Sequence, residues 1–275
     1  MPTSQALIHQ INTLSVGHGS LALWSLGQAG LVLKGGETIA YLDPYLTNSI
    51  DEAAFARQFP SPLAPKEVTN NHVVFCTHEH RDHTDAATVT PLAQASPRAT
   101  FVGPANSRDI LLACAIDDDR ISVPQVNQSY TVQGVEFSAI PAAHYGLDYD
   151  PERGYRWLGY VITLNGVTLY HTGDTIWFDS LLDHLRPHQI DITAIPVNGR
   201  DWMRDRQGII GNFDGVEALE LTVALGADVL IPLHNDLFAG NHDSPAVLAE
   251  YQDRRHPRQK VHWLQPGELY YYVKG

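Results

Sequence analysis

Four side chains that bind metal ions readily lie within one run of six residues, His78-Glu79-His80-Arg81-Asp82-His83. An apolar stretch at 73–76 precedes the run, and a segment that can form a helix follows at 85–95. Side chains at positions i and i+2 of an extended chain project to the same side, so His78 and His80 can share one cation. Asp82 and His83 fall in the turn before the helix and can reach a second point nearby. Imidazole and carboxylate ligands in this pattern suit zinc, manganese or iron.

Three more residues of the same types follow predicted strands farther along the chain: His144, Asp174 and His234. The strands that they follow are predicted at 137–140, 167–171 and 229–232. Each of these residues alone is more often an ordinary loop residue. Together they fit a site built by loops at one edge of a sheet, which is where binding and catalytic residues concentrate.

The elements that must position these residues are predicted as short strands and helices. Gly-rich turns separate apolar runs at 21–26, 31–34 and 38–42, which is typical of an antiparallel meander. Asn165-Gly166 gives the strongest hairpin signal. Helices are predicted at 106–115, 175–185, 215–225 and 246–254. No linker divides the chain, so we expect one α/β domain over 1–275, with layered sheets covered by helices and two similar halves that meet near 145–160.

Two long loops stand out from this pattern. The Pro-punctuated segment 44–65 is predicted as a surface loop or lid, and it is a candidate contact arm for a homo-oligomer. The loop at 198–212 contains Arg200, Arg204 and Arg206, which could clamp a phosphate or carboxylate of a substrate. The alternative for these arginines is an ordinary solvated loop.

Composition limits the classes of partner. The chain has 275 residues and a net charge of −13, with 18 basic against 31 acidic side chains, which argues against nucleic acids and anionic membranes as partners. No apolar stretch is long enough to span a membrane, and no signal peptide is recognisable. With only two cysteines, a reducing cytoplasm is the expected location. A small molecule is therefore the expected substrate.

The HxHxDH spacing, the later His144, the Gly173-Asp174-Thr175 segment and the strand-end His234 resemble the metallo-β-lactamase fold superfamily. The segments 24–30 and 231–236 extend the resemblance to its L-ascorbate-6-phosphate lactonase-like hydrolases. The resemblance implies a four-layer αββα sandwich, in which two mixed sheets have helices outside. It also implies two divalent cations, zinc or manganese, with iron as a further option. One cation would be held by His78, His80 and His144, the other by Asp82, His83 and His234, with Asp174 bridging them.

The implied activity is metal-dependent hydrolysis. Two cations would lower the pKa of a bound water towards neutrality, and the resulting hydroxide would attack a carbonyl or phosphoryl centre. Asp82 and Asp174 are the expected catalytic carboxylates, while His171 and Asp236 could orient the ligands through hydrogen bonds. The branch suggests a small anionic substrate such as a lactone or a phosphorylated sugar lactone. The alternatives are a phosphodiesterase of the phospholipase D-like or nuclease type and, less favoured, a di-iron redox protein.

Overall fold

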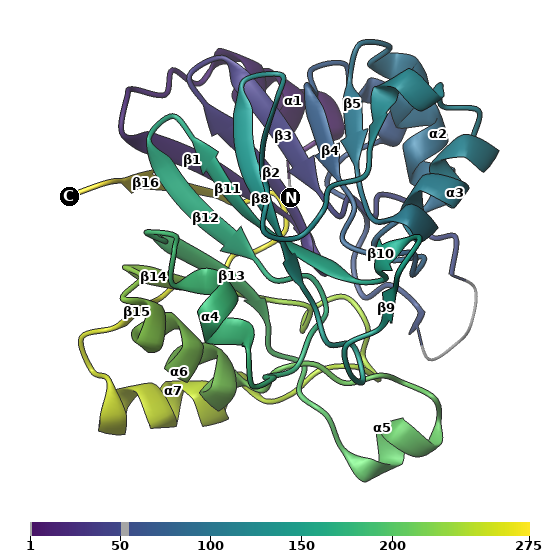
Figure 1. The fold of residues 1–275 in the computed structure, drawn as a ribbon. Coiled ribbons are helices and arrows are strands. Elements are labelled where there is room, and N and C mark those ends of the chain that lie inside the picture. The colour runs from purple at the N-terminus through teal and green to yellow at the C-terminus, as the bar shows by residue number, and fades with distance from the viewer. Residues whose placement is uncertain (1, 51–54) are drawn as a thin grey trace.

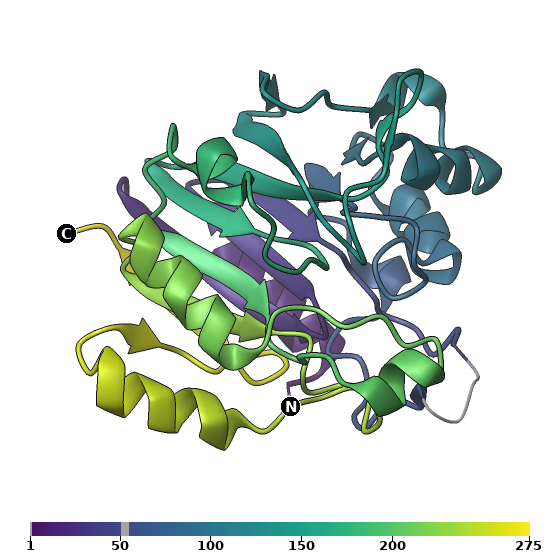
Figure 2. The same cartoon turned by 60° about the horizontal axis from the view of Figure 1, so that its bottom comes forward.

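Two seven-stranded sheets face one another, and helices cover their outer surfaces (Figures 1 and 2). The computed structural model describes residues 2–50 and 55–275. This arrangement confirms the predicted α/β fold with two mixed sheets and helices outside.

The first sheet is antiparallel at one side and parallel at the other. Antiparallel pairing joins its first four strands, and parallel pairing joins β3 to β6. In spatial order its strands are β16 (Leu269–Val273), β1 (Ser20–Gly27), β2 (Gly30–Gly35), β3 (Thr38–Leu42), β4 (Val73–Phe75), β5 (Thr100–Val102) and β6 (Ile121–Ser122).

The second sheet repeats this mixture. Its antiparallel part runs from β7 to β12, and its parallel part runs from β12 to β15. In spatial order its strands are β7 (Ser129–Val132), β8 (Val135–Pro141), β11 (Leu158–Leu164), β12 (Val167–His171), β13 (Ile192–Pro196), β14 (Val229–Leu233) and β15 (Lys260–Val261). A separate hairpin pairs β9 (Tyr149–Asp150) with β10 (Gly154–Tyr155).

The helices other than α5 divide between the two outer faces, and α5 projects from a loop away from the sheets (Figure 1). The helix bounds are α1 (Ser4–Thr13), α2 (Ala86–Ala95), α3 (Ala105–Ala113), α4 (Leu181–Leu185), α5 (Trp202–Arg206), α6 (Gly215–Leu225) and α7 (Pro245–Arg255), with short 3-10 turns η2 (Pro65–Glu67) and η3 (Asp118–Arg120). Buried residues of α1, α2 and α3 pack against the first sheet, and those of α4, α6 and α7 pack against the second. No helix in the described part of the chain is long and apolar enough to cross a membrane.

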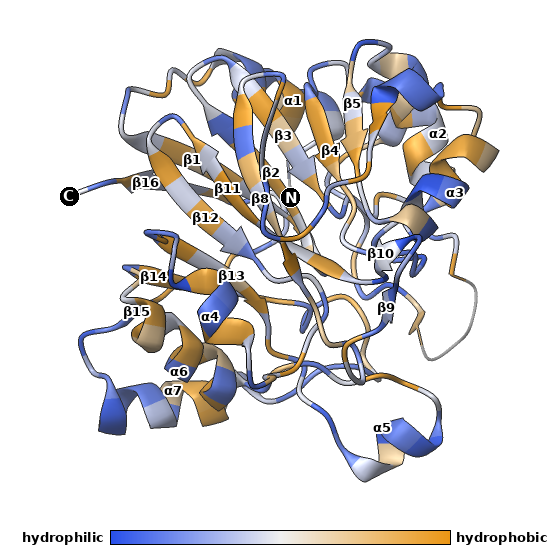
Figure 3. Cartoon of the chain, in the orientation of Figure 1, coloured by the Kyte–Doolittle hydropathy of each residue, from blue (hydrophilic) through white to orange (hydrophobic). Residues whose placement is uncertain are grey.

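The main core lies between the sheets. Leu23 and Leu33 of the first sheet belong to the same buried cluster as Tyr160, Ile162 and Leu169 of the second. Figure 3 shows apolar residues concentrated in the strands of both sheets. Because side chains on both faces of the central strands, such as β1, β2, β12, β13 and β14, are buried, the sheets form a rigid platform for the loops at their ends.

The predicted Asn165-Gly166 hairpin is confirmed. β11 and β12 pair antiparallel up to Leu164 and Val167, and both turn residues have positive φ, as a two-residue turn of this kind requires. The sequence did not reveal helix α1. Thr3 caps this helix, because its side chain accepts a hydrogen bond from the Ala6 amide. Only Leu7 and Ile11 of the helix are buried, and their packing is its main source of stability.

One helix prediction and two loop predictions need correction. The helix predicted at 175–185 begins only at Leu181, because Thr175 and Ile176 are hydrogen-bonded to the backbones of Ala143 and Phe213 instead of to a helical turn. The predicted 198–212 loop contains the short helix α5. In the predicted 44–65 surface loop, Tyr45 and Leu46 are buried, while 51–54 lies outside the described residues.

Candidate metal centre

Three strands of the second sheet run in the same direction and end at one edge. β8 and β12 both pair antiparallel with β11, and β12, β13 and β14 are mutually parallel. The loops after β8, β12 and β14 carry His144, Asp174 and His234 respectively. The topology therefore brings together three residues that lie 30 or more positions apart in the sequence.

The histidine run after β4 forms a compact turn. The Thr84 amide donates to the His80 carbonyl at 2.8 Å, and the Thr84 hydroxyl donates to the His78 carbonyl at 2.5 Å. Asp85 then accepts a hydrogen bond from the Ala87 amide and caps α2. These bonds hold the run in one conformation and direct its side chains towards the second sheet's edge.

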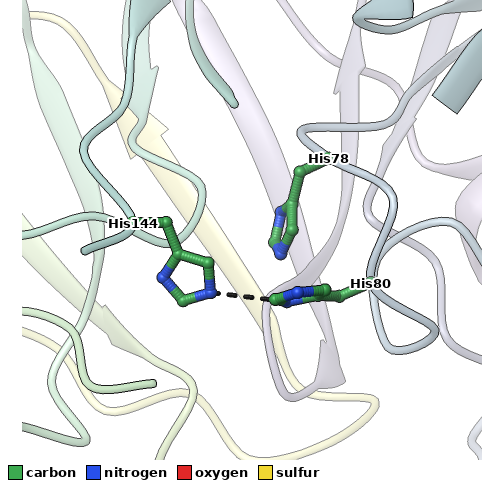
Figure 4. Close-up of side chains that lie close together, drawn as sticks. All are labelled: His78, His80 and His144. Carbon is green, nitrogen blue, oxygen red and sulfur yellow. Dashed lines mark hydrogen bonds between the residues drawn. The ribbon is translucent and has the colours of Figure 1, made fainter. Parts of the chain in front are cut away.

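His78, His80 and His144 form the first group of potential ligands. One ring nitrogen from each lies within 4.8 Å of the others, and His144 Nε2 is 3.3 Å from His80 Nδ1. Figure 4 shows the three rings turned towards one another. Three imidazoles around one point are a donor set that zinc and other divalent metals accept.

Asp82, His83 and His234 form a second group beside the first. His234 Nε2 lies 3.3 Å from Asp82 Oδ2, and His83 Nε2 lies 3.6 Å from the same oxygen. Asp174 lies between the groups: its carboxylate oxygens are 3.4 Å from His83, 3.3 Å from His234 and 3.9 Å from His144. A carboxylate in this place could contribute to both groups.

Orphaned buried atoms indicate that this cluster is suited to binding metal ions. Among the described residues, His78 Nε2, His83 Nε2 and Asp174 Oδ1 are buried without a hydrogen-bond partner. An unsatisfied buried polar group costs about 1–3 kcal/mol, and here three of them converge. Cations coordinated by these lone pairs would remove that penalty, so the residues present fit a metal centre.

Asp43, which the sequence analysis missed, fixes the orientation of His83. Its carboxylate is 2.7 Å from His83 Nδ1 and accepts hydrogen bonds from the Thr77 amide at 2.8 Å and hydroxyl at 2.7 Å. Hydrogen bonding at Nδ1 leaves Nε2 as the lone pair that faces Asp82 and Asp174. The available signal was the position of Asp43 after strand β3, at the same edge as the histidine run.

Gln28 was also missed, although its segment contributed to the resemblance. Its side-chain amide nitrogen lies 2.8 Å from both Asp82 Oδ2 and His234 Nε2. Its backbone has φ 57°, and Asp236 stabilises this turn by accepting a hydrogen bond from the Gln28 amide at 2.9 Å. Asp236, predicted to orient the ligands, therefore contacts the backbone of Gln28, which in turn contacts Asp82 and His234.

His171 supports the loop that carries Asp174. Its Nε2 lies 2.8 Å from the Ala29 carbonyl, and its Nδ1 accepts a hydrogen bond from the Gly173 amide at 3.2 Å. His171, predicted to orient the ligands, therefore contacts the backbone of Ala29 and of Gly173, next to Asp174.

The two groups differ in their electrostatics. Burial lowers the pKa of His78 well below its usual value and that of His144 to about 4, which keeps their lone pairs available. Burial also opposes the charged form of His234, but Asp174 and Asp82 outweigh it and raise its pKa to about 9. The same carboxylates raise the pKa of His83 well above its usual value despite its burial.

Cation binding by the second group is therefore expected to depend on pH. A cation must displace the proton that His234 holds up to about pH 9, so its affinity should rise by at least about tenfold per pH unit from about pH 7 to 9. His78 and His144 hold no proton in that range. Titrations against a coloured chelator at several pH values would measure both sites, and an affinity of the second group that does not change with pH would contradict the expectation.

Replacing Gln28 with leucine is expected to weaken the second group by about 10–100-fold in metal affinity, as loss of a group that orients ligands typically does. The substitution preserves much of the volume but removes the amide that contacts Asp82 and His234. The exposed Gln5→Leu change is the matched control. Equal affinities of the Gln28→Leu and Gln5→Leu proteins would show that the amide has no such role.

A pocket of about 350 Å³ opens above this cluster. Its lining includes His80, Asp82, His144, Asp174 and His234, together with Ile50, Phe55, Glu79, Arg81, Gly208, Ile209, Ile210, Phe238 and Asn241. The volume is at the lower end of ligand pockets, which span about 300–1,000 Å³. A small molecule can therefore reach the potential ligands.

The three arginines predicted to clamp a substrate lie outside the pocket lining, and each guanidinium group has other neighbours. Arg200 pairs with Glu217 at 2.6 Å, and Arg204 contacts Asp201 and the Asn198 carbonyl. Arg206 lies over the exposed ring of Trp202. None of the three arginines lines the pocket, and only the neighbouring 208–210 does.

Comparison with known proteins agrees with this architecture. The family model described as the beta-lactamase superfamily domain matches residues 40–235, which include every residue of the cluster. The chain belongs to this superfamily. The resemblance expected from the sequence is thereby confirmed.

The individual proteins that match the chain share only a small part of its sequence. The chain is 24% identical over 289 residues to the probable L-ascorbate-6-phosphate lactonase UlaG of Escherichia coli O127:H6, covering 92% of this chain and 80% of the relative. Two solved structures share the fold. One is a possible metal-dependent hydrolase from Veillonella parvula, with a TM-score of 0.71 and 16% identity over 92% of this chain and 99% of that one. The other is an isothiocyanate hydrolase from Delia radicum gut bacteria, with a TM-score of 0.70 and 18% identity over 92% of this chain and 100% of that one. With the His/Asp cluster, the superfamily identifies the chain as a metal-dependent hydrolase.

Proposed function

We propose that the chain hydrolyses a small ester or lactone at a centre that holds two divalent cations, zinc or manganese. The observation that carries the proposal is the position of Asp174, between two groups of potential ligands below a pocket that admits a small molecule. His78, His80 and His144 would hold one cation, and Asp82, His83 and His234 the other.

The side chains of this site would position the attacking water. Divalent cations, when bound, lower the pKa of bound water towards neutrality and polarise a carbonyl group. Burial opposes ionisation of Asp174, but His234 and His83 outweigh it and hold the pKa of the carboxyl well below its usual range. Asp174 is therefore ionised at neutral pH and can accept a hydrogen bond from water. Asp82, which also lines the pocket, can do the same.

Similarity to a probable lactonase supports a lactone or related ester as the substrate class. The expectation of a phosphorylated or otherwise anionic substrate depended partly on the three arginines of the 198–212 loop, which are engaged elsewhere. We therefore propose ester hydrolysis without requiring a phosphate. A cytoplasmic location is supported by Cys76 and Cys114, both of which are free thiols.

A substrate panel would test the proposed function. Protein stripped by chelation and reloaded with zinc or manganese should hydrolyse lactones or carboxylic esters, and chelation should remove this activity. The panel should also contain phosphodiesters, sugar phosphates and β-lactams. Turnover of phosphodiesters alone would overturn the proposal in favour of a phosphodiesterase.

A further inference from the structure

We propose that the pocket above the metal centre binds an uncharged, apolar group of the substrate, so that esters or lactones with a short aliphatic or aromatic substituent are preferred. This inference rests on the proposed function, because it concerns what is attached to the group that is hydrolysed. Five apolar side chains, from three separate segments, carry it: Ile50, Phe55, Ile209, Ile210 and Phe238.

Phe238 is the centre of one wall. Its ring contacts Phe55 edge-on, with centroids 5.4 Å apart, and lies 6.2 Å from the ring of Tyr45. It is buried within the described structure yet lines the pocket, so it presents only a small part of its ring to a ligand. An aromatic face of this kind binds apolar groups without a directional polar contact.

Backbone contacts hold this wall in place. The Gln58 amide donates to the Leu237 carbonyl at 2.9 Å, which joins the two segments that carry Phe55 and Phe238. The Arg57 guanidinium donates to the carbonyls of Tyr45 and Thr47 at 3.1 and 3.0 Å. The arginine is thus used to connect segments behind the wall and is not among the residues that line the pocket.

The second wall is formed by Ile209 and Ile210, directly after helix α5. The Ile209 amide donates to the Arg204 carbonyl, and the Arg204 side chain donates to the Asn198 carbonyl at 2.5 Å. Asn198 in turn donates to Asn241 at 2.9 Å, which connects this loop to the segment that follows Phe238. The two walls therefore form one hydrogen-bonded frame, and the arginine expected to bind substrate instead fixes the loop.

The charged side chains of the pocket are unsuited to an anionic tail. Asp82 and Asp174 lie at its floor. The cations would neutralise negative charge on the group that is hydrolysed, but these carboxylates would repel a second negative charge elsewhere on the substrate. Glu79, which is half-buried, accepts a hydrogen bond from Arg156 at 2.6 Å. Arg81 is exposed at the rim, with one guanidinium nitrogen 3.5 Å from the Ser49 carbonyl. The apolar walls therefore favour an uncharged substituent.

Two homologous series test the inference with cation-loaded protein. The first is p-nitrophenyl esters from acetate to hexanoate, with hemiesters of dicarboxylic acids of equal length as charged partners. We expect kcat/KM to rise roughly fourfold per methylene over the first few carbons, as burial of a methylene predicts, and the charged partners to react at least about tenfold more slowly. A flat series, or a preference for the charged partners, would overturn the inference.

The second series separates this inference from the proposed function. Aliphatic hydroxamates bind divalent cations through their head group, so calorimetry can report on the tail without any turnover. Affinity should rise along the alkyl series by a similar factor per methylene. If hydroxamate affinity rises along the series while no ester or lactone is hydrolysed, the apolar subsite stands and the proposed function fails. If hydrolysis is observed but affinity is independent of the tail, the inference fails alone.

Variants of residues in the two walls test whether these walls produce the chain-length dependence. Ile209→Ser and Phe238→Ala should both flatten the chain-length dependence in the two series, and Ile209→Lys should shift the preference towards the charged partners. Trp202→Ala, an exposed aromatic residue on α5 outside the pocket lining, is the matched control and should keep the full dependence. Because Phe238 belongs to a buried cluster, the Ile209 variants preserve the test if Phe238→Ala does not fold. An unchanged dependence in folded Ile209→Ser protein that retains its metal would place the subsite elsewhere and overturn the assignment.

Discussion

Replacing His80 with alanine is expected to abolish turnover and to reduce the amount of bound metal at the same time. His80 Nδ1 lies 3.3 Å from His144 Nε2, and the two rings converge with His78 on one point. Removing one of three imidazoles leaves an incomplete donor set, so metal affinity should fall by at least about a hundredfold, more than the loss of an outer hydrogen bond would cause. Metal analysis after dialysis and hydrolysis assays of the same sample would measure both effects.

A histidine outside the cluster provides the control for this experiment. His9 lies exposed on α1, and His9→Ala removes the same side chain far from the pocket. This protein should keep its metal content and activity. Full activity in His80→Ala protein with an unchanged metal content would show that the His78, His80 and His144 group is not the catalytic cation site.

Replacing Asp43 with alanine is expected to affect both stability and metal binding. The buried carboxylate accepts hydrogen bonds from the Thr77 amide and hydroxyl and contacts His83, so its removal leaves up to three buried polar groups without a partner. We expect the free energy of unfolding to fall by about 3 kcal/mol. Loss of the His83 contact should also lower metal affinity at the second group by about 10–100-fold.

The Asp43→Asn protein separates the effect of the lost hydrogen bonds from the effect of the lost negative charge. Asp43 has φ 40°, a conformation that asparagine tolerates better than alanine does, so the backbone should remain unstrained. Asparagine keeps one acceptor oxygen but has no negative charge to pair with His83. Urea denaturation should place its stability between those of the native and alanine proteins, while metal titration should still show a loss. Native metal affinity in Asp43→Asn would contradict the orienting role of the charge.

The sequence was informative about the metal cluster because its determinants are local. The spacing from His78 to His83 is readable directly, and His144, Asp174 and His234 each follow an apolar run that forms a strand. Once strands of one direction are assigned to a sheet, their ends must meet at one edge. The convergence of these residues could therefore be anticipated without coordinates.

The parts that the sequence did not reveal depend on contacts between distant segments. The pairing of Arg200 with Glu217 and of Arg204 with Asn198 removes both guanidinium groups from the pocket, and nothing in the composition of the loop indicates those partners. Gln28 acquires its contact with His234 only when the two sheets face one another, and Asp43 meets His83 only when β3 and β4 pair within the first sheet. Single-residue patterns carry no information about such pairings.

The position of β16 has a consequence for the order of folding. This strand, Leu269–Val273, pairs with β1, Ser20–Gly27, so about 250 residues separate two neighbours in the first sheet. During synthesis, one edge of β1 has no partner until almost all of the chain has left the ribosome. Contacts of such long sequence separation slow folding, and an open strand edge invites pairing with other chains meanwhile. We therefore expect nascent chains that stop before β16 to be held by chaperones or to aggregate.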